Sequence, residues 1–148
     1  MKRFYLVAVS TFILDRISKF LALEFLSQSV PVIPGVFHLT LLHNRGIAFG
    51  LFSQIPWLLI AVVTVSLVII LWMAHRPAFR KPFDQLVFGL ILGGAFGNWL
   101  DRVLYGAVID YFDFRIWPVF NVADSAISIG VGLYLFHLLR QPREVKVS

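Results

Sequence analysis

The sequence contains no cysteine among its 148 residues. This absence excludes disulfide bonds, metal sites built on thiolates, and a cysteine nucleophile. Charged residues are also scarce, because Asp, Glu, Lys and Arg make up only 14% of the chain, against about 25% in typical soluble domains. Any chemistry therefore depends on a small number of carboxylates, amides, hydroxyls and histidines.

Long apolar runs occupy most of the chain instead. Hydrophobic residues account for 59% of the sequence, and the mean hydropathy is +0.83. A helix needs about 20 apolar residues to cross the roughly 30 Å hydrocarbon layer of a membrane. Four segments meet this requirement, at about 4–26, 56–74, 84–101 and 122–140. We therefore expect an all-α membrane protein with four transmembrane helices, in which residues 1–148 form a single integral membrane domain.

The basic residues predict how these helices are oriented. They gather before the first span, between the second and third, and after the fourth, at Lys2, Arg3, His75, Arg76, Arg80, Lys81, Arg140, Arg143 and Lys146. Because positive charge is retained on the cytoplasmic side, both termini and the 75–83 loop are expected in the cytoplasm. The net charge of +5 is then explained by topology, and we expect no nucleic-acid partner.

The two connections on the other side of the membrane are more than simple turns. The first, SVPVIPGVFHLTLLHNRGIAFGLFS, is punctuated by proline and glycine and partly alternates over VFHLTLLHN. This pattern predicts a small extracytoplasmic β-rich segment between helices 1 and 2. The second, residues 102–121, is rich in aromatic side chains of the kind found at headgroup depth. We expect it to form a loop or flap between helices 3 and 4.

The first span carries charged residues that are costly in lipid unless they are paired. Asp15 and Lys19 are four residues apart and share a helix face, so they can neutralise each other. Arg16 points about 100° away and needs another partner or a route to solvent. Taken alone, this group is explained by a structural ion pair.

The third span ends in GGAFGNWLDRV. Gly93 and Gly97 have the GxxxG spacing that lets another helix approach closely. Asn98, Asp101 and Arg102 follow on one face, and we expect Asp101 to form a salt bridge with Arg102. Two interpretations of this face are open. Either the arginine extends toward the membrane surface and pairs with the aspartate at a helix end, or the three residues belong to a functional site. Asn98 favours the second alternative, because an amide inside a span needs a hydrogen-bond partner.

Elimination among the known kinds of catalytic site leaves the aspartates. The four histidines are scattered, Ser125 has no Lys or His base nearby in the sequence, and no HExxH-like metal-binding pattern occurs. Four aspartates lie toward the outer side, at Asp101, Asp110, Asp113 and Asp124. Two carboxylates held close together share one proton, and such a pair activates water to attack an amide. The sequence therefore indicates an aspartyl hydrolase at the membrane surface, without a metal or other cofactor.

Asp124 and Asp110 differ in whether a structural role alone explains them. Asn121 is a good N-cap for the fourth helix, and an acidic residue at Asp124, three positions later, is typical of a helix start. A capping role alone therefore explains Asp124. Asp110 has no such explanation, because apolar and aromatic residues flank it on both sides.

The order of five motifs resembles the bacterial lipoprotein signal peptidases (signal peptidase II). These motifs are DRISK, NRGIAFG, GGAFGNWLDR, VIDYF and FNVADSAI, and together they extend over nearly the whole chain. The resemblance implies a four-helix aspartyl protease of the bacterial cytoplasmic (inner) membrane, with its active site at the extracytoplasmic face. It also implies a substrate, a diacylglyceryl-modified prolipoprotein, cleaved just before the lipidated cysteine, with membrane lipids as the surroundings.

The resemblance assigns roles to residues of this chain. It places the catalytic pair at Asp110 and Asp124, with Asp101 as a rival for the first of these. The other family positions correspond to Asp15, Lys19, Asn44, Gly46, Asn98, Asp101, Arg102 and Asn121. Among them, Asn98, Arg102 and Asn44 are expected to contact the substrate, and Asp15 and Asp101 to hold the cations and helices in place. Arg16 departs from the glutamine more usual in the family.

Two other functions remain open on the sequence. A small transporter or channel subunit would use the charged pairs to line a polar pathway, but the repeated halves typical of transporters are not visible. A non-catalytic membrane assembly factor is the weaker alternative.

Overall fold

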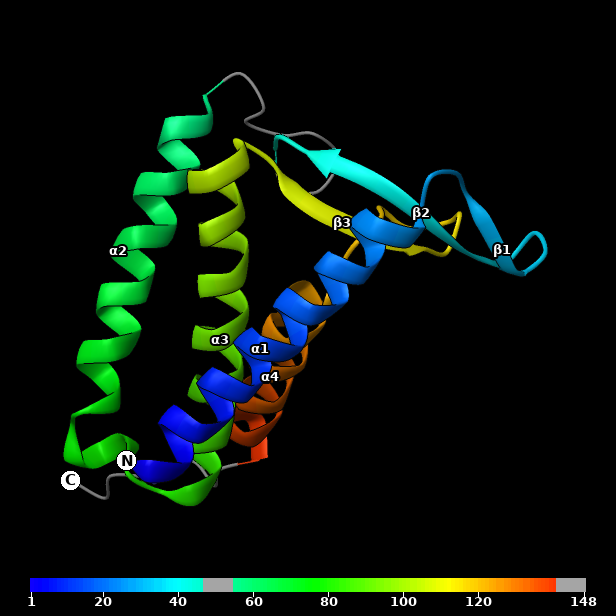
Figure 1. The fold of residues 1–148 in the computed structure, drawn as a ribbon. Helices are drawn as coiled ribbons and strands as arrows, with labels where there is room; N and C mark the ends of the chain where they lie inside the picture. The colour runs from blue at the N-terminus through cyan, green and yellow to red at the C-terminus, as the bar shows by residue number, and fades with distance from the viewer. Residues whose placement is uncertain (47–54, 141–148) are drawn as a thin grey trace.

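The computed structural model describes residues 1–46 and 55–140. These residues form four α-helices, one short 3-10 helix and three strands. In chain order the elements are α1 (Lys2–Phe25), β1 (Val30–Ile33), β2 (Phe37–Asn44), α2 (Pro56–Ala74), η2 (Pro77–Phe79), α3 (Pro82–Tyr105), β3 (Val108–Asp113) and α4 (Val122–Arg140). The four helices form a bundle, and the sheet extends sideways from one end of it (Figure 1). The N-terminus and the end of α4 lie at the opposite end. The expected fold class of four helices with a small sheet is confirmed.

Helix α3 lies at the centre and packs against α1, α2 and α4. Glycines allow this close approach, as the GxxxG spacing predicted. A Cβ atom on Gly93 would collide with the carbonyl oxygen of Ala8, and one on Gly97 would collide with the carboxylate of Asp15. On the α4 side, a Cβ on Gly94 would come within 2.5 Å of the Ala123 carbonyl oxygen. The polar residues of α1 and α4 are thereby brought against α3.

The outward faces of the helices are apolar. Large exposed side chains include Leu6 and Phe20 on α1, Trp57 and Val68 on α2, and Leu139 on α4. Two stretches are long and apolar enough to cross a membrane by themselves, with mean hydropathies of 2.7 for Trp57–Ala74 and 1.6 for Val122–Arg140. Helices α1 and α3 have a lower mean hydropathy because they contain buried charged residues.

The three strands form one antiparallel sheet in the order β1-β2-β3. The first two strands come from the connection between α1 and α2, as the alternating pattern predicted. The third, β3, lies in the α3–α4 connection, where the sequence predicted only a loop or flap. It pairs with β2 so that Leu42 lies opposite Asp110 and Asn44 opposite Val108. Because β3 is buried along most of its length, it lacks the alternation of polar and apolar residues that reveals a strand.

Candidate active site

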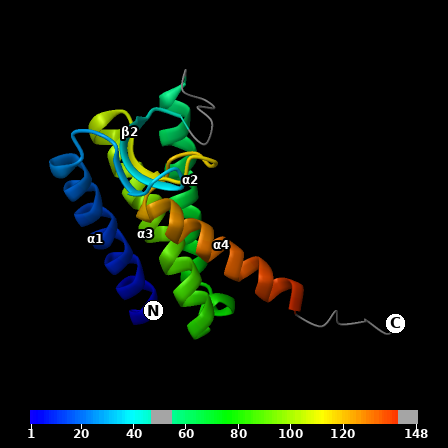
Figure 2. The ribbon, with the colours of Figure 1, turned by 90° about the vertical axis from the view of Figure 1, so that its right-hand side faces the viewer.

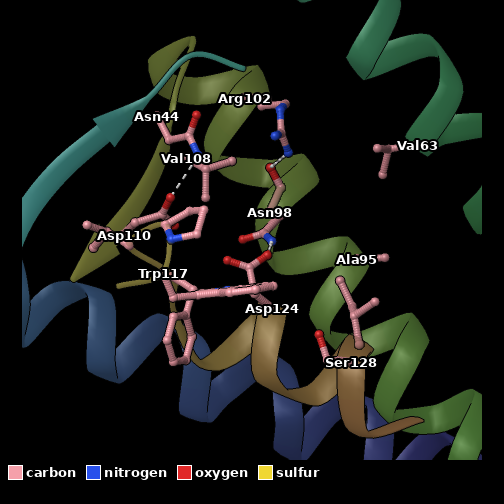
Figure 3. Close-up of a pocket in the computed structure, with 14 residues that line it drawn as sticks. Asn44, Val63, Ala95, Asn98, Arg102, Val108, Asp110, Trp117, Asp124 and Ser128 are labelled. Atoms are coloured by element: carbon pink, nitrogen blue, oxygen red, sulfur yellow. Dashed lines mark hydrogen bonds between the residues drawn. The ribbon is translucent and has the colours of Figure 1, made fainter. Parts of the chain in front are cut away.

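A cavity of about 370 Å³ lies between α2, α3, α4 and the end of the α3–α4 connection (Figure 3). Its polar lining comes from four elements of the chain. Asn44 lies at the end of β2, Asn98 and Arg102 on α3, and Asp110 and Asp124 on β3 and α4. The structure therefore brings five of the residues singled out from the sequence to one place.

Asp110 projects from β3 and is almost completely buried, with 1% of its surface exposed. Its two carboxylate oxygens accept hydrogen bonds from different amides, Asn44 Nδ2 at 2.9 Å and Asn121 Nδ2 at 2.7 Å. Burial, followed by the negative charge of Asp124, raises the pKa of Asp110 from 3.8 to about 7. The two amides and Lys19 oppose this rise without cancelling it. Asp110 is thus able to gain or lose a proton near neutral pH.

Asp124 is held by a reciprocal cap at the start of α4. The Asn121 side-chain oxygen accepts a hydrogen bond from the Asp124 backbone N–H at 2.8 Å. In return, the Asp124 carboxylate accepts one from the Asn121 backbone N–H at 3.3 Å. The predicted N-cap is therefore confirmed. The cap leaves Oδ1 of Asp124 available to accept a further bond from Asn98 Nδ2 at 2.7 Å.

Two amides connect the carboxylates to a buried lysine. Asn98 Oδ1 accepts hydrogen bonds from Lys19 Nζ at 2.8 Å and from Asn121 Nδ2 at 3.1 Å. Because both donors approach the oxygen of Asn98, its nitrogen is directed toward Asp124. The same Asn121 nitrogen reaches Asp110. Lys19 therefore fixes how the two amides present their donors to the two aspartates.

The charged residues of α1 form a compact network with α3. Lys19 Nζ lies 3.0 Å from Asp15 and 2.7 Å from Asp101, and Arg16 Nη2 lies 3.0 Å from Asp15 and 2.7 Å from Asp101. The expected i,i+4 pair of Asp15 and Lys19 is present. Arg16 finds its partners within the bundle and also bonds the Gly97 carbonyl at 3.4 Å. Two cations thus balance two carboxylates in the interior.

The expected salt bridge between Asp101 and Arg102 is wrong. Neighbouring residues on a helix point about 100° apart, so Asp101 faces α1 while Arg102 faces the cavity. The Arg102 guanidinium instead donates to the Gly46 carbonyl at 2.8 Å and to the Asn98 carbonyl at 3.4 Å. Asp101 is fully buried among its cations and does not line the cavity. Its position does not suit it to be the partner of Asp124.

Asn44 and Gly46 form a turn at the end of β2. The Gly46 backbone N–H donates to the side-chain oxygen of Asn44 at 3.0 Å, which leaves the amide nitrogen of Asn44 free to reach Asp110. The Arg102 bond to Gly46 ties this turn to α3. Residues 47–50 of the NRGIAFG motif, together with Arg143 and Lys146, lie outside the described residues.

Part of the cavity wall was not identified from the sequence. Trp117, Pro118, Val119 and Phe120 line it from the α3–α4 connection, which the sequence predicted as an aromatic-rich loop or flap without naming its residues as part of the site. Asp113, an outer aspartate with no assigned role, anchors this segment. It accepts bonds from the Thr40 hydroxyl at 3.0 Å and from the Arg115 backbone N–H at 2.9 Å. No motif marks these contacts in the sequence.

Metal binding finds no support in residues 1–46 and 55–140, which contain no group of three His, Asp or Glu side chains that could hold an ion. The polar side chains of the cavity are two carboxylates, two amides, a guanidinium and the hydroxyl of Ser128. Such a set can bind a peptide backbone and move a proton.

Comparison with known proteins assigns this arrangement to a family. The family model described as signal peptidase (SPase) II matches residues 7–140, which include every polar residue of the cavity. The chain belongs to the signal peptidase II family. A lipoprotein signal peptidase of Halothermothrix orenii is 43% identical over 141 residues, covering 94% of this chain and 97% of that protein. One of Nostoc punctiforme is 45% identical over 137 residues, covering 89% and 86%.

The fold is shared with solved structures of bacterial membrane enzymes. A structure described as a bacterial membrane enzyme superposes with a TM-score of 0.87 at 31% identity, covering 99% of this chain and 96% of that chain. A second structure with the same description gives a TM-score of 0.86. The resemblance to signal peptidase II is thus confirmed. Because the chain belongs to an aspartic peptidase family, the transporter and assembly-factor alternatives are no longer retained. The chain is a bacterial membrane enzyme.

Proposed function

We propose that this chain removes the signal peptide from diacylglyceryl-modified prolipoproteins by cutting just before the lipidated cysteine. Support comes from the signal peptidase II family model and from relatives that carry the name lipoprotein signal peptidase. The observation that carries the proposal is the presence of two carboxylates, Asp110 and Asp124, on one cavity between apolar helices. An apolar cavity with a few polar groups suits an apolar peptide whose backbone has to be held for cleavage.

Asp110 and Asp124 are the proposed catalytic pair. Asp124 accepts hydrogen bonds from Asn98 Nδ2 and from the Asn121 backbone N–H at the start of α4, and we assign it the role of the base. Asp110, with a pKa near 7, carries the shared proton over the acidic and neutral range. The ionised carboxylate takes a proton from a water molecule as the water oxygen bonds to the scissile carbonyl carbon. The protonated carboxyl donates to the carbonyl oxygen, and the C–N bond then breaks as a proton passes to the leaving nitrogen.

The remaining site residues position the substrate and the pair. Asn98 and Arg102 line the cavity from α3, and Asn44 lines it from β2, so these side chains are proposed to contact the substrate backbone or its lipid-bearing segment. Gly46 and Asn121 hold them in place through the hydrogen bonds described above. Asp15, Lys19 and Asp101 act through these groups rather than on the substrate.

We further propose that the chain is a single multi-pass domain of the bacterial cytoplasmic membrane, with both termini in the cytoplasm. Lys2 and Arg3 lie at the start of α1, and Arg76, Arg80 and Lys81 lie between α2 and α3. These elements meet at the end of the bundle opposite to the sheet, so the positive-inside rule directs that end to the cytoplasm. The catalytic cavity then faces the extracytoplasmic side, and membrane lipids surround the helices.

The test compares Asp110→Asn and Asp124→Asn with Glu24→Gln, each reconstituted in lipid with a diacylglyceryl-modified prolipoprotein. Glu24 is exposed on α1 and does not line the cavity, which makes it a control for the loss of a carboxylate. We expect each of the first two variants to lose at least about a thousandfold in rate, and the control to keep most of it. Near-native cleavage by a folded Asp110→Asn or Asp124→Asn protein would refute the catalytic pair. Failure of the unmodified chain to cleave would refute the function.

A further inference from the structure

A second cavity, of about 290 Å³, lies between α1, α2 and α3 and is called the α1–α2 groove below. The two helices come close near the N-terminus and diverge toward the sheet (Figure 1 and Figure 2). The walls are apolar and include Val9 and Phe12 on α1, Leu67 and Leu71 on α2, and Phe96 on α3. Because Val9 is 53% exposed, the groove is open to the surroundings of the bundle. It shares no lining residue with the catalytic cavity.

The α1–α2 groove has a polar side chain at each end. At the end near the N-terminus, the Tyr5 hydroxyl and His75 Nε2 are 3.2 Å apart and connect α1 to the residue that follows α2. At the other end lies Arg16, which follows Tyr5, Val9 and Phe12 on one face of α1 because these positions are three or four residues apart. Its guanidinium carbon is 5.9 Å from the centre of the Phe12 ring.

The Arg16 guanidinium has donors that the protein does not use. Its hydrogen bonds and ion pairs with Asp15, Gly97 and Asp101 are all made by Nη2. Among residues 1–46 and 55–140, no hydrogen-bond partner reaches the buried Nε, and 23% of the side chain is exposed. Unused donors are costly in a membrane. Because two carboxylates already balance the charge of Arg16 and Lys19, a neutral acceptor such as a carbonyl oxygen is enough.

The length of the α1–α2 groove matches the depth of one membrane leaflet. Tyr5 and Arg16 are eleven residues apart on α1, which is about 16 Å at a rise of ~1.5 Å per residue. The hydrocarbon layer is roughly 30 Å thick, so the acyl chains of one leaflet reach about 15 Å. Gly97, to which Arg16 bonds, is four residues before the end of the third apolar span (84–101). An acyl chain whose ester group is at Arg16 therefore extends to Tyr5.

We propose that the α1–α2 groove binds one acyl chain of an ester-linked glycerolipid of the membrane, and that the ester carbonyl accepts a hydrogen bond from Arg16. The substrate's own acyl chains are not the occupant, because the packed pair of α2 and α3 lies between the groove and the catalytic cavity. That pair is joined by a hydrogen bond from Trp99 Nε1 to Thr64 Oγ1 at 2.8 Å. Val63 on α2 lines the catalytic cavity, so the bound lipid supports a wall of that cavity from the other side.

The experiment follows thermal unfolding of the full chain in detergent micelles to which dioleoyl phosphatidylethanolamine or its diether analogue is added. The two lipids have the same headgroup and chain length, but the diether lacks both ester carbonyls. At about ten times the dissociation constant of the ester lipid, we expect this lipid to raise the melting temperature by about 3–6 °C. The diether at the same concentration should raise it by only about 1 °C, as expected for roughly tenfold weaker binding.

Val9→Trp and Val65→Trp are the matched pair of variants. Val9 lines the groove, whereas Val65 is 58% exposed on α2 and lines neither the groove nor the catalytic cavity. A tryptophan at position 9 occupies the groove, so Val9→Trp should lose the rise with the ester lipid and Val65→Trp should keep it. Arg16→Gln should respond equally to the two lipids, because its single amide group is engaged by the neighbouring carboxylates.

Other results would overturn the proposal. Equal rises with the two lipids on the unmodified chain would show that no ester carbonyl is bound, even if a variant failed to fold. Loss of the rise in both tryptophan variants, or in neither, would show that the lipid solvates the helices in general and does not occupy the groove. None of these measurements involves cleavage, so their outcome is independent of the proposed function.

Discussion

The side-chain amide of Asn121 donates a hydrogen bond to the side-chain carbonyl of Asn98, 3.1 Å away. Each of these residues also donates to one of the two aspartates, Asn121 to Asp110 and Asn98 to Asp124. One connected pair of amides therefore contacts both carboxylates, and Asn44 adds a separate hydrogen bond to Asp110. A substitution of either asparagine should therefore change the orientation of both carboxylates.

Asn98→Ala tests this connection. The variant removes the donor to Asp124 and the acceptor for Lys19, and a hydrogen bond to a charged group contributes about 1.5–3 kcal/mol. We expect kcat to fall by about ten- to a hundredfold. Ser128→Ala is the control, because Ser128 lines the same cavity and no hydrogen bond joins it to either carboxylate. Equal effects of the two substitutions would argue against the amide pair.

Asn44→Ala should alter the pH dependence of cleavage. Because the pKa of Asp110 is raised to about 7, its proton is held from the ordinary carboxyl range up to neutral pH. Above pH 7 both carboxylates ionise, so kcat/KM should fall on the alkaline side with a midpoint near 7. Asn44 donates to the ionised form of Asp110 and thereby lowers its pKa. Removing it should move the midpoint upward by about one pH unit.

The measurement is the kcat/KM profile from pH 5 to pH 9 for the unmodified enzyme and the variant. A downward movement of the alkaline limb, or an unchanged one with full activity, would contradict the role of Asn44 at Asp110.

Lys19→Met and Arg16→Gln should differ sharply in stability. Lys19 is 1% exposed and neutralises both Asp15 and Asp101, so its loss leaves buried carboxylates short of a cation at a cost of about 3–5 kcal/mol. The Arg16 side chain is 23% exposed and glutamine keeps hydrogen-bond donors toward the same carboxylates, so we expect a smaller cost of about 1–2 kcal/mol. Thermal unfolding in detergent checks both. Equal destabilisation would mean that Arg16 carries as much of the network as Lys19.

Gly97→Ala should destabilise the bundle, whereas Gly132→Ala should not. A Cβ at position 97 collides with the Asp15 carboxylate, while one at position 132 has no atom within 4 Å. The first change forces α1 and α3 apart, at a cost of about 1–3 kcal/mol. The second gains up to about 1 kcal/mol of helix propensity. The two melting temperatures, measured under the same conditions, should lie on opposite sides of the native value.

The sequence predicted the helices because apolar length is a local pattern, and the Asn121 cap is readable from Asn121 and Asp124, three positions apart. The residues alone left four outer aspartates open, and the resemblance to signal peptidase II singled out Asp110 and Asp124 among them. The partner of Asp101 was mispredicted because sequence neighbours on a helix point in different directions. Strand β3 was missed since its burial removes the alternation on which strand prediction depends.

Other parts of the site depend on contacts between distant segments. The bond from Arg102 to Gly46 spans 56 residues of sequence, and nothing in either motif specifies it. Trp117 lines the cavity because Asp113 and Thr40 anchor the segment before it, and no pattern in the sequence encodes that anchor.

The cap at Asn121 has a consequence for how the enzyme comes into being. Asn121 caps α4, orients Asp124 and donates to Asp110, so one residue contacts both carboxylates. A ribosome-bound chain from which this residue has not yet emerged contains Asp110 with only the hydrogen bond from Asn44. The protease should therefore be inactive during this stage of its own synthesis and acquire activity only when α4 enters the membrane.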